Sequence, residues 1–242
     1  MALMMPPALT DRHALFLDFD GTLAPLQDDP DAVHLPVGGD GLLAGLADHL
    51  DGALALVSGR DVRDLSTRVP PHLWRAGNHG AAILEPGRMI DELPEAPAEL
   101  RAVADAMAAE DDGLWLEVKG PVLALHVRHA AHLADEAETR FRKAAASVDG
   151  YSVQRGNGII EFKPQHADKG AAIRHLCESA PFTGRIPVFV GDDTTDEDGF
   201  MAVNDLGGMA VKVGAGETVA GFRLADVPAT WRWLTESFDS LS

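Results

Sequence analysis

The chain has 242 residues, of which 46% are hydrophobic, and its 38 acidic and 20 basic residues give a formal charge of −18. This apolar content is ample for a packed core, which excludes a disordered chain, and the length fits one large domain or two modest ones. Nucleic-acid binders usually carry a basic face, so the acidic balance argues against a nucleic-acid partner. A phosphate site in such an acidic chain needs local positive charge, and a divalent cation is the simplest source.

Targeting signals are weak in this sequence. No apolar stretch approaches the roughly 20 residues of a membrane helix, so we expect no membrane partner. The N-terminal stretch 1–13 has no early positive charge and is interrupted by Pro6 and Pro7, which makes it a poor signal peptide. A single cysteine, Cys177, excludes an intrachain disulfide and fits a reducing compartment. We therefore expect a cytoplasmic protein.

Apolar runs alternate with helical patterns in the N-terminal part of the chain. The predicted elements are a strand (13–19), a helix (42–50), a second strand (53–60), a helix (61–69) and a third strand that runs into a loop (73–83). Strands that are apolar throughout and alternate with helices indicate a parallel sheet covered on both faces. This part therefore predicts an α/β fold.

The middle of the chain follows a different pattern. Its order is helix (94–110), two strands (114–129), helix (130–148) and two further strands (151–156 and 158–164). The strands alternate apolar with polar residues, as a sheet with one solvated face requires. We therefore predict an α+β module over 93–163, inserted into an α/β core made of 1–92 and 164–242.

Two more apolar runs, 186–193 and 207–214, complete the predicted core sheet. Polar residues stand where the apolar runs of the sheet stop, and they are Asp18, Asp20, Ser58, Asp192 and Asp193. Ligands of open α/β sheets bind beyond the carboxyl ends of the strands, so we expect these side chains to meet in one crevice. Residues two apart on a strand point to the same side, which directs Asp18 and Asp20 into that crevice together.

Carboxylates this close tolerate each other when a cation lies between them or when their protonation states differ. The stretch GDDTTDE (191–197) adds further carboxylates, and oxygen ligands of this kind suit Mg²⁺. A metal-bound aspartate can act as a nucleophile while a second carboxyl group transfers protons. Ser58 and Lys169 are then candidates to hold phosphate oxygens.

Each of these signals has a simpler alternative. An Asp-x-Asp pair or a Ser-Gly-Arg turn occurs by chance, and Lys169 would fit a surface position in the first turn of a helix near Asp168. The stretch 191–197 would also fit an acidic turn, whereas a calcium loop spreads its ligands over about twelve residues ending in Glu. The sharpest signal is Asp-x-Asp-Gly-Thr (18–22) directly after an apolar strand.

Taken together, FLDFDGTL (16–23), VSGR (57–60), HADKG (166–170) and VGDDTTDE (190–197) resemble the four ordered motifs of the haloacid-dehalogenase superfamily, in its phosphatase branch. The resemblance implies a haloacid-dehalogenase-like, Rossmannoid α/β core, and the inserted module is similar to the superfamily's αββαββ cap. Within the branch the chain most resembles the trehalose-6-phosphate phosphatases, chiefly through GDDTTDE and LEVKGPVLALHVR (116–128). Ala82 departs from that family, which often has an acidic residue there.

The resemblance implies a role for each matching core residue. Asp18 would attack phosphorus, and Asp20 would protonate the leaving sugar oxygen and then deprotonate the attacking water. Mg²⁺ would bind the side chains of Asp18 and Asp192 and the backbone carbonyl of Asp20. Ser58 and Lys169 would bind the transferring phosphoryl group. The remaining core residues implied at the site are Thr22, Gly59, Arg60, Asn78 and His79 toward the substrate, with Asp193 and Asp196 as support.

Sugar recognition is expected in the cap. Glu117 and Lys119 would share one strand face, His126 and Arg128 would share a face of the next strand, and Glu161 would lie on the last. These side chains would present hydrogen-bonding groups to sugar hydroxyls, and closure of the cap would exclude water. The alternative is that they are an ordinary solvated face.

The function implied is Mg²⁺-dependent hydrolysis of trehalose 6-phosphate through an aspartyl-phosphate intermediate. Two alternatives stay open: another sugar phosphate as substrate (of sucrose, mannosylglycerate or a hexose), or a catalytically silent protein that is a sugar-phosphate sensor or a scaffold partner of a synthase. The silent alternative predicts loss of Asp18, Asp20 or Lys169, and all three are present. The expected partners are a small sugar phosphate and a trehalose-phosphate synthase.

Overall fold

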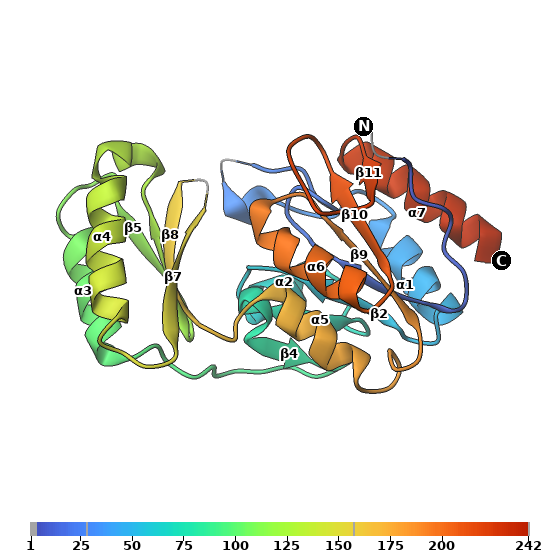
Figure 1. The fold of residues 1–242 in the computed structure, drawn as a ribbon, viewed down its shortest axis with the longest axis horizontal. Coiled ribbons are helices and arrows are strands. Elements are labelled where there is room, and N and C mark those ends of the chain that lie inside the picture. The colour runs from blue at the N-terminus through green and yellow to red at the C-terminus, as the bar shows by residue number, and fades with distance from the viewer. Residues whose placement is uncertain (1–3, 28, 157, 242) are drawn as a thin grey trace. The chain divides into compact units, whose positions relative to one another are not determined.

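The computed structural model describes residues 4–27, 29–156 and 158–241, and it divides into two compact units (Figure 1). The core unit comprises residues 1–89 and 168–242, and the inserted unit comprises residues 90–167. The first three residues of the N-terminal stretch considered above lie outside the described residues. None of the described helices is long and apolar enough to cross a membrane.

The core unit is built on a seven-stranded sheet with the order β11-β10-β9-β1-β2-β3-β4. Its strands are β1 (His13–Leu17), β2 (Leu54–Val57), β3 (Trp74–Gly77), β4 (Ala82–Leu84), β9 (Ile186–Gly191), β10 (Met209–Val213) and β11 (Phe222–Leu224). Every pairing is parallel except that of β3 with β4. The predicted parallel α/β sheet is therefore confirmed, with two short edge strands, β4 and β11, that were not predicted.

Every residue of the central strands β1 and β2 is buried, because helices cover both faces of this sheet. The helices are α1 (Gly39–His49), α2 (Val62–Arg68), α5 (Lys169–Cys177), α6 (Glu197–Asp205) and α7 (Val227–Leu241), with short 3-10 turns η1 (Pro30–Ala32), η2 (Asn78–Gly80) and η4 (Thr194–Asp196). The helices α5 and α6 pack side by side, and α1 packs against α7 (Figure 1).

The register of the three central strands decides where the site forms. Leu15 of β1 lies opposite Leu54 of β2, and Leu17 of β1 lies opposite Val190 of β9. Because β1, β2 and β9 run in the same direction, their carboxyl ends reach the same edge of the sheet. The residues that follow these strands are thereby brought together.

A glycine allows α6 to lie close to β9. At Gly199 an added Cβ would overlap the ring of Phe189 in the buried core. Gly199→Ala is therefore expected to lower the free energy of unfolding by about 1–3 kcal/mol through overpacking. Gly41→Ala, at an exposed site in α1 with open space around it, is expected to raise it by about 0.5–1 kcal/mol. Urea unfolding of both variants measures this, and equal effects would contradict the close packing.

The inserted unit has the predicted order of elements. They are α3 (Ala98–Ala108), β5 (Trp115–Lys119), β6 (Val122–His126), η3 (Arg128–Leu133), α4 (Ala134–Ala145), β7 (Tyr151–Gly156) and β8 (Ile159–Pro164). The antiparallel sheet has the order β5-β6-β8-β7. One face packs on α3 and α4, where Phe141 and Phe162 stack with ring centroids 3.9 Å apart.

One prediction in this unit is wrong. Strand β6 ends at His126 and Arg128 begins the 3-10 helix η3, so the two residues do not share a strand face. Period-two alternation continues through residue 128 in the sequence, but the backbone turns at Val127. The polar face of the sheet is instead continued across the strands, where Glu117, Ala124, Glu161 and Gln154 lie directly opposite one another in a row.

Candidate active site

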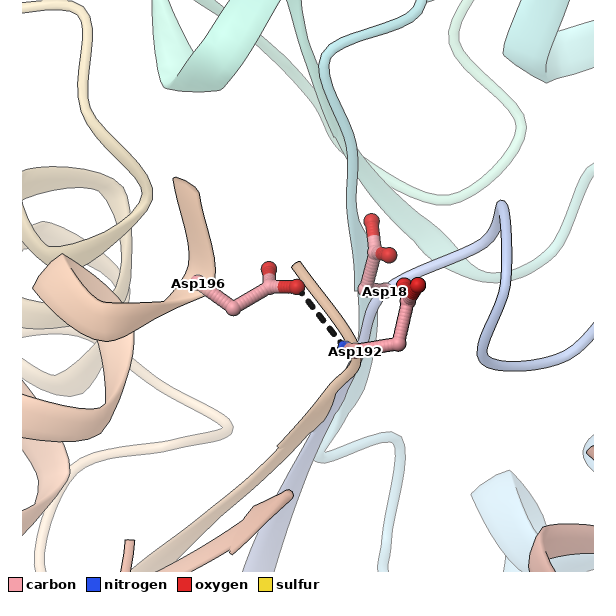
Figure 2. A group of neighbouring side chains, drawn as sticks. All are labelled: Asp18, Asp192 and Asp196. Carbon is pink, nitrogen blue, oxygen red and sulfur yellow. Dashed lines mark hydrogen bonds between the residues drawn. The ribbon is translucent and has the colours of Figure 1, made fainter. Parts of the chain in front are cut away.

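Three carboxylates meet at the carboxyl edge of the core sheet. Figure 2 shows Asp18 after β1, Asp192 after β9, and Asp196 reaching toward both from the end of η4. One oxygen atom of each carboxylate lies within 4.8 Å of one oxygen atom of the other two. From the sequence, Asp18 and Asp192 were expected as metal ligands and Asp196 as a supporting residue.

Lys169 places a positive charge among these carboxylates. Its Nζ atom donates to Asp18 Oδ1 at 2.7 Å and to Asp196 Oδ1 at 2.6 Å, and its side chain is 3% exposed. It is the first residue of α5, whose start is fixed by Asp168, the N-cap that accepts from the Ala171 amide. Burial alone would lower the pKa of Lys169, but the two carboxylates raise it, so this residue is an ammonium ion.

Asp196 stabilises the neighbouring backbone in addition to pairing with Lys169. Its Oδ2 atom accepts from the backbone amides of Asp192 and Asp193, each at 2.9 Å, so both of its oxygens are in use. Asp193 caps the same turn, and the two residues form a reciprocal capping box. A Cβ at Gly191 would overlap the Asp196 side chain, so glycine is required at the end of β9. This arrangement fixes the backbone that carries Asp192.

The surroundings of Asp18 and Asp192 disfavour the charged form of both carboxyl groups. Burial, followed by repulsion from Asp196, raises the pKa of Asp18 well above its usual range and that of Asp192 to about 6. Thr22 lies between them, with Oγ1 at 3.4 Å from Asp18 Oδ2 and 3.3 Å from Asp192 Oδ1. One hydroxyl proton serves only one carboxylate at a time. A divalent cation with oxygen ligands therefore fits this pair of side chains.

Asp20 does not belong to the three-carboxylate group. Both of its oxygens accept hydrogen bonds from Arg60. The Arg60 Nε atom lies 2.7 Å from Oδ2, and the Arg60 Nη2 atom lies 2.6 Å from Oδ1. Arg60 was predicted to contact substrate, and the structure gives it this carboxylate as a partner. Ser58 is buried at the end of β2, and its Oγ accepts from the Arg60 amide at 3.1 Å.

The other predicted core residues lie beside this loop. Asn78 is fully buried, and its Oδ1 accepts from the Val62 amide at the start of α2, so it supports the fold instead of presenting a free surface. His79 is also buried and has a positive φ of 56°. A Cβ at Gly59 would lie 2.7 Å from His79 Cε1, which explains the need for glycine after Ser58.

Sequence reasoning missed Lys212. This residue is on β10, its side chain is 4% exposed, and its Nζ donates a hydrogen bond to the backbone carbonyl of Asp192. A lysine within the apolar run MAVKV was the available signal, because a strand buried on both faces seldom carries a charge without a partner. Lys212 holds the peptide that follows β9.

In the inserted unit, the polar sheet face carries one ion pair and one side-chain hydrogen bond to a histidine. Lys119 Nζ lies 2.7 Å from Glu161 Oε1, and Glu117 Oε2 lies 3.0 Å from His126 Nε2. Although burial opposes it, the His126 hydrogen bond and the Lys119 charge lower the pKa of Glu117. Trp115, which the sequence analysis missed, stacks on His126 at a centroid distance of 3.7 Å. Gln154 extends the same row of residues, and Arg128 is exposed on η3.

A buried lysine among aspartates at the carboxyl edge of a parallel sheet, with an αββαββ unit inserted in the chain, defines a haloacid-dehalogenase-like fold. A solved haloacid dehalogenase-like hydrolase from Bacteroides thetaiotaomicron shares the fold, with a TM-score of 0.67 and 16% identity over 94% of this chain and 98% of that one.

More specific similarity identifies the family. The sequence profile described as "Trehalose-phosphatase" matches residues 16–228. The trehalose-6-phosphate phosphatase of Escherichia coli (strain K12) is 42% identical over 235 residues, which are 94% of this chain and 87% of that protein. A solved "trehalose-6-phosphate phosphatase related protein" has a TM-score of 0.75 and 26% identity, covering 93% of this chain and 97% of that one. The chain belongs to the trehalose-phosphatase family.

Proposed function

We propose that this chain hydrolyses trehalose 6-phosphate to trehalose and phosphate, using Mg²⁺. The observation that carries the proposal is the buried Lys169 ammonium bonded to Asp18, with Asp192 beside it, at the carboxyl edge of the sheet. Membership of the trehalose-phosphatase family supports the substrate. The same geometry argues against a silent sensor, because Asp18, Asp20 and Lys169 are all present and each is held by side-chain hydrogen bonds.

The proposed reaction has two steps. An Asp18 oxygen attacks phosphorus as the bond from phosphorus to the sugar oxygen breaks, and Asp20 gives a proton to that leaving oxygen. Asp20 then takes a proton from water, whose oxygen attacks phosphorus and releases phosphate from Asp18. Lys169 and Ser58 bind the phosphoryl oxygens as their charge changes. The 2.7 Å bond from Lys169 opposes the rise in the pKa of Asp18 and orients its carboxyl group for attack.

The residues proposed to hold Mg²⁺ are the side chains of Asp18 and Asp192 and the backbone carbonyl of Asp20. When bound, the ion supplies charge neutralisation to the attacking carboxylate and the phosphoryl oxygens. The raised pKa of Asp192, about 6, supports a cation here, since a neighbouring positive charge favours the carboxylate form. Thr22, Asp193 and Asp196 are proposed to orient these ligands.

Phosphate release from a panel of sugar phosphates, measured with Mg²⁺ and with EDTA, tests the proposal. We expect a preference of about 100-fold or more in kcat/KM for trehalose 6-phosphate over sucrose, mannosylglycerate and hexose phosphates. EDTA should remove the activity, and Mg²⁺ should restore it. Equal rates on all the sugar phosphates would keep the chemistry and reject the substrate.

We propose that the polar face of the inserted sheet selects the sugar, through Glu117, Lys119 and Glu161 with help from His126 and Arg128. Glu117→Ala is expected to lower kcat/KM for trehalose 6-phosphate by about 10–100-fold, because a sugar hydroxyl loses its hydrogen-bonding partner. Hydrolysis of p-nitrophenyl phosphate should change little. Glu99→Ala, at an exposed residue of α3, is the matched control. Equal losses on both substrates would reject a role in sugar selection.

The synthase partner and the cytoplasmic location expected from the sequence stay predictions. Pull-down of a trehalose-phosphate synthase by the purified chain tests the first.

A further inference from the structure

We propose that Arg60 is the positioning residue of Asp20: it sets the direction from which Asp20 delivers its proton to the leaving oxygen. The inference rests on the proposed function, because it takes Asp20 as the proton donor. It differs from the role expected from the sequence, in which Arg60 contacts the substrate directly. The two roles predict different responses to the chemistry of the leaving group.

The guanidinium of Arg60 is held by groups other than Asp20. Its Nη1 atom donates to Asp64 Oδ2 at 2.8 Å, and its Nη2 atom donates to the Pro30 carbonyl at 3.1 Å. Its Cζ atom lies over the ring of Phe19, 5.4 Å from the centroid. Three separate segments of the core unit therefore fix the planar guanidinium group, whose nitrogen atoms form a rigid fork. The Arg60 side chain is only 11% exposed.

The backbone of Arg60 is held as firmly as its side chain. The Arg60 amide donates to Ser58 Oγ at 3.1 Å, and its carbonyl accepts from the Asn78 amide at 2.6 Å. Asn78 in turn caps α2 through Val62. The fork is thus attached to the loop that also carries Ser58, so the position of Asp20 is tied to that of a proposed phosphoryl ligand.

Asp20 has little else to orient it. Its side chain is 29% exposed, and within the described part of the chain Arg60 provides the hydrogen bonds recorded for its carboxylate. It lies in a turn, where Gly21 has a φ of 74° and donates to the Ala24 carbonyl. A short side chain on a turn can rotate about χ1, and a two-point bond to a fixed fork removes that freedom.

The consequence for catalysis depends on the leaving group. A sugar alkoxide is a poor leaving group and needs a proton delivered along the breaking bond, whereas a nitrophenolate leaves without one. A misplaced Asp20 therefore slows the first kind of substrate selectively. A residue that binds the phosphoryl group would slow both kinds equally, because the phosphoryl group is common to them.

The test is a series of alkyl and aryl phosphates of graded leaving-group pKa, with kcat/KM measured for the wild type and for Arg60→Ala. We expect a loss of about 100-fold for alkyl phosphates, trehalose 6-phosphate included, and of less than about threefold for p-nitrophenyl phosphate. The plot of log kcat/KM against leaving-group pKa should become steeper. An unchanged slope with a uniform loss overturns the proposal and returns Arg60 to direct substrate contact.

A double-mutant cycle with Asp20→Asn tests whether Arg60 acts through Asp20. The single variant Asp20→Asn should steepen the plot by itself, and adding Arg60→Ala should then cost little more. Multiplicative losses in the double variant would overturn the proposal. The alkyl and aryl series gives this answer whichever sugar the chain prefers, so failure of the trehalose assignment is seen separately in the sugar panel.

Two further variants complete the experiment. Arg60→Lys keeps the charge but loses the two-point fork, and it should show an intermediate slope even where Arg60→Ala unfolds. Arg63→Ala is the matched control, because Arg63 of α2 pairs with Asp61, the N-cap of that helix, and its side chain is 42% exposed. The slope for Arg63→Ala should equal that of the wild type.

Discussion

Asp18→Asn is expected to lower kcat by at least about a thousandfold while leaving the core unit folded. An amide keeps the size of the carboxyl group, and its oxygen still accepts the hydrogen bond from Lys169, so the packing is preserved. The amide is a much weaker nucleophile and carries no charge to place against a cation. Stability should change little, because the substitution also removes repulsion from Asp196 and Asp192.

Acid-quench trapping with ³²P-labelled substrate separates this role from a general loss of activity. The wild-type chain should take up label transiently as an aspartyl phosphate, and Asp18→Asn should take up none. Asp20→Asn is the matched variant: with an aryl phosphate it should form the intermediate and hydrolyse it slowly, so that label accumulates. If Asp18→Asn retains more than about one per cent of the wild-type rate, the assignment of Asp18 as the nucleophile is contradicted.

Lys169→Met is expected to damage both stability and turnover. Lys169 holds two buried carboxylates, and removing one partner of a buried ion pair typically costs about 3–5 kcal/mol. For a chain of this size the loss corresponds to a fall in Tm on the order of 10 °C. Lys169 is also the proposed cationic ligand of the phosphoryl group, so kcat/KM should fall by about 100-fold or more.

The stability effect can be assigned by measuring Tm in EDTA and in Mg²⁺. A cation between Asp18 and Asp192 replaces part of the missing charge, so the loss in Tm should be larger in EDTA than in Mg²⁺. Lys143→Met, at an exposed position of α4, is the matched control and should leave both Tm and turnover unchanged. An unaltered Tm for Lys169→Met would contradict the ion-pair geometry.

The core sheet and the edge at which the site forms could be predicted from the sequence. Strands β1, β2 and β9 are buried on both faces, so apart from His13 they carry apolar residues and glycine, and polar residues directly follow them. The topology of parallel strands then brings Asp18, Ser58 and Asp192 to one edge. Strands β4 and β11 have three residues each, too few to produce a periodic pattern.

Side-chain partners were harder to predict, because they depend on the positions of distant loops. Arg60 was expected beside the substrate, yet its partner Asp20 is forty residues earlier in the chain. Lys212 serves the Asp192 carbonyl from a neighbouring strand, and no local pattern identifies that contact. Arg128 was misplaced because alternation in the sequence does not reveal where β6 turns into a 3-10 helix. A sequence pattern indicates whether a residue is buried or exposed, whereas its side-chain partners depend on which distant segments the fold brings beside it.

The chain passes between its two units only at residues 89–90 and 167–168, and each unit has a hydrophobic core of its own. The aspartates, Ser58 and Lys169 all belong to one of these units, and the polar sheet face with Glu117 and Glu161 belongs to the other. Substitutions on that face therefore lie in a unit whose hydrophobic core is separate from the one beside the aspartates. If the proposed roles hold, the choice of sugar can change in one unit while the phosphoryl chemistry is preserved in the other, and an exchange of inserted units between relatives would use the same independence.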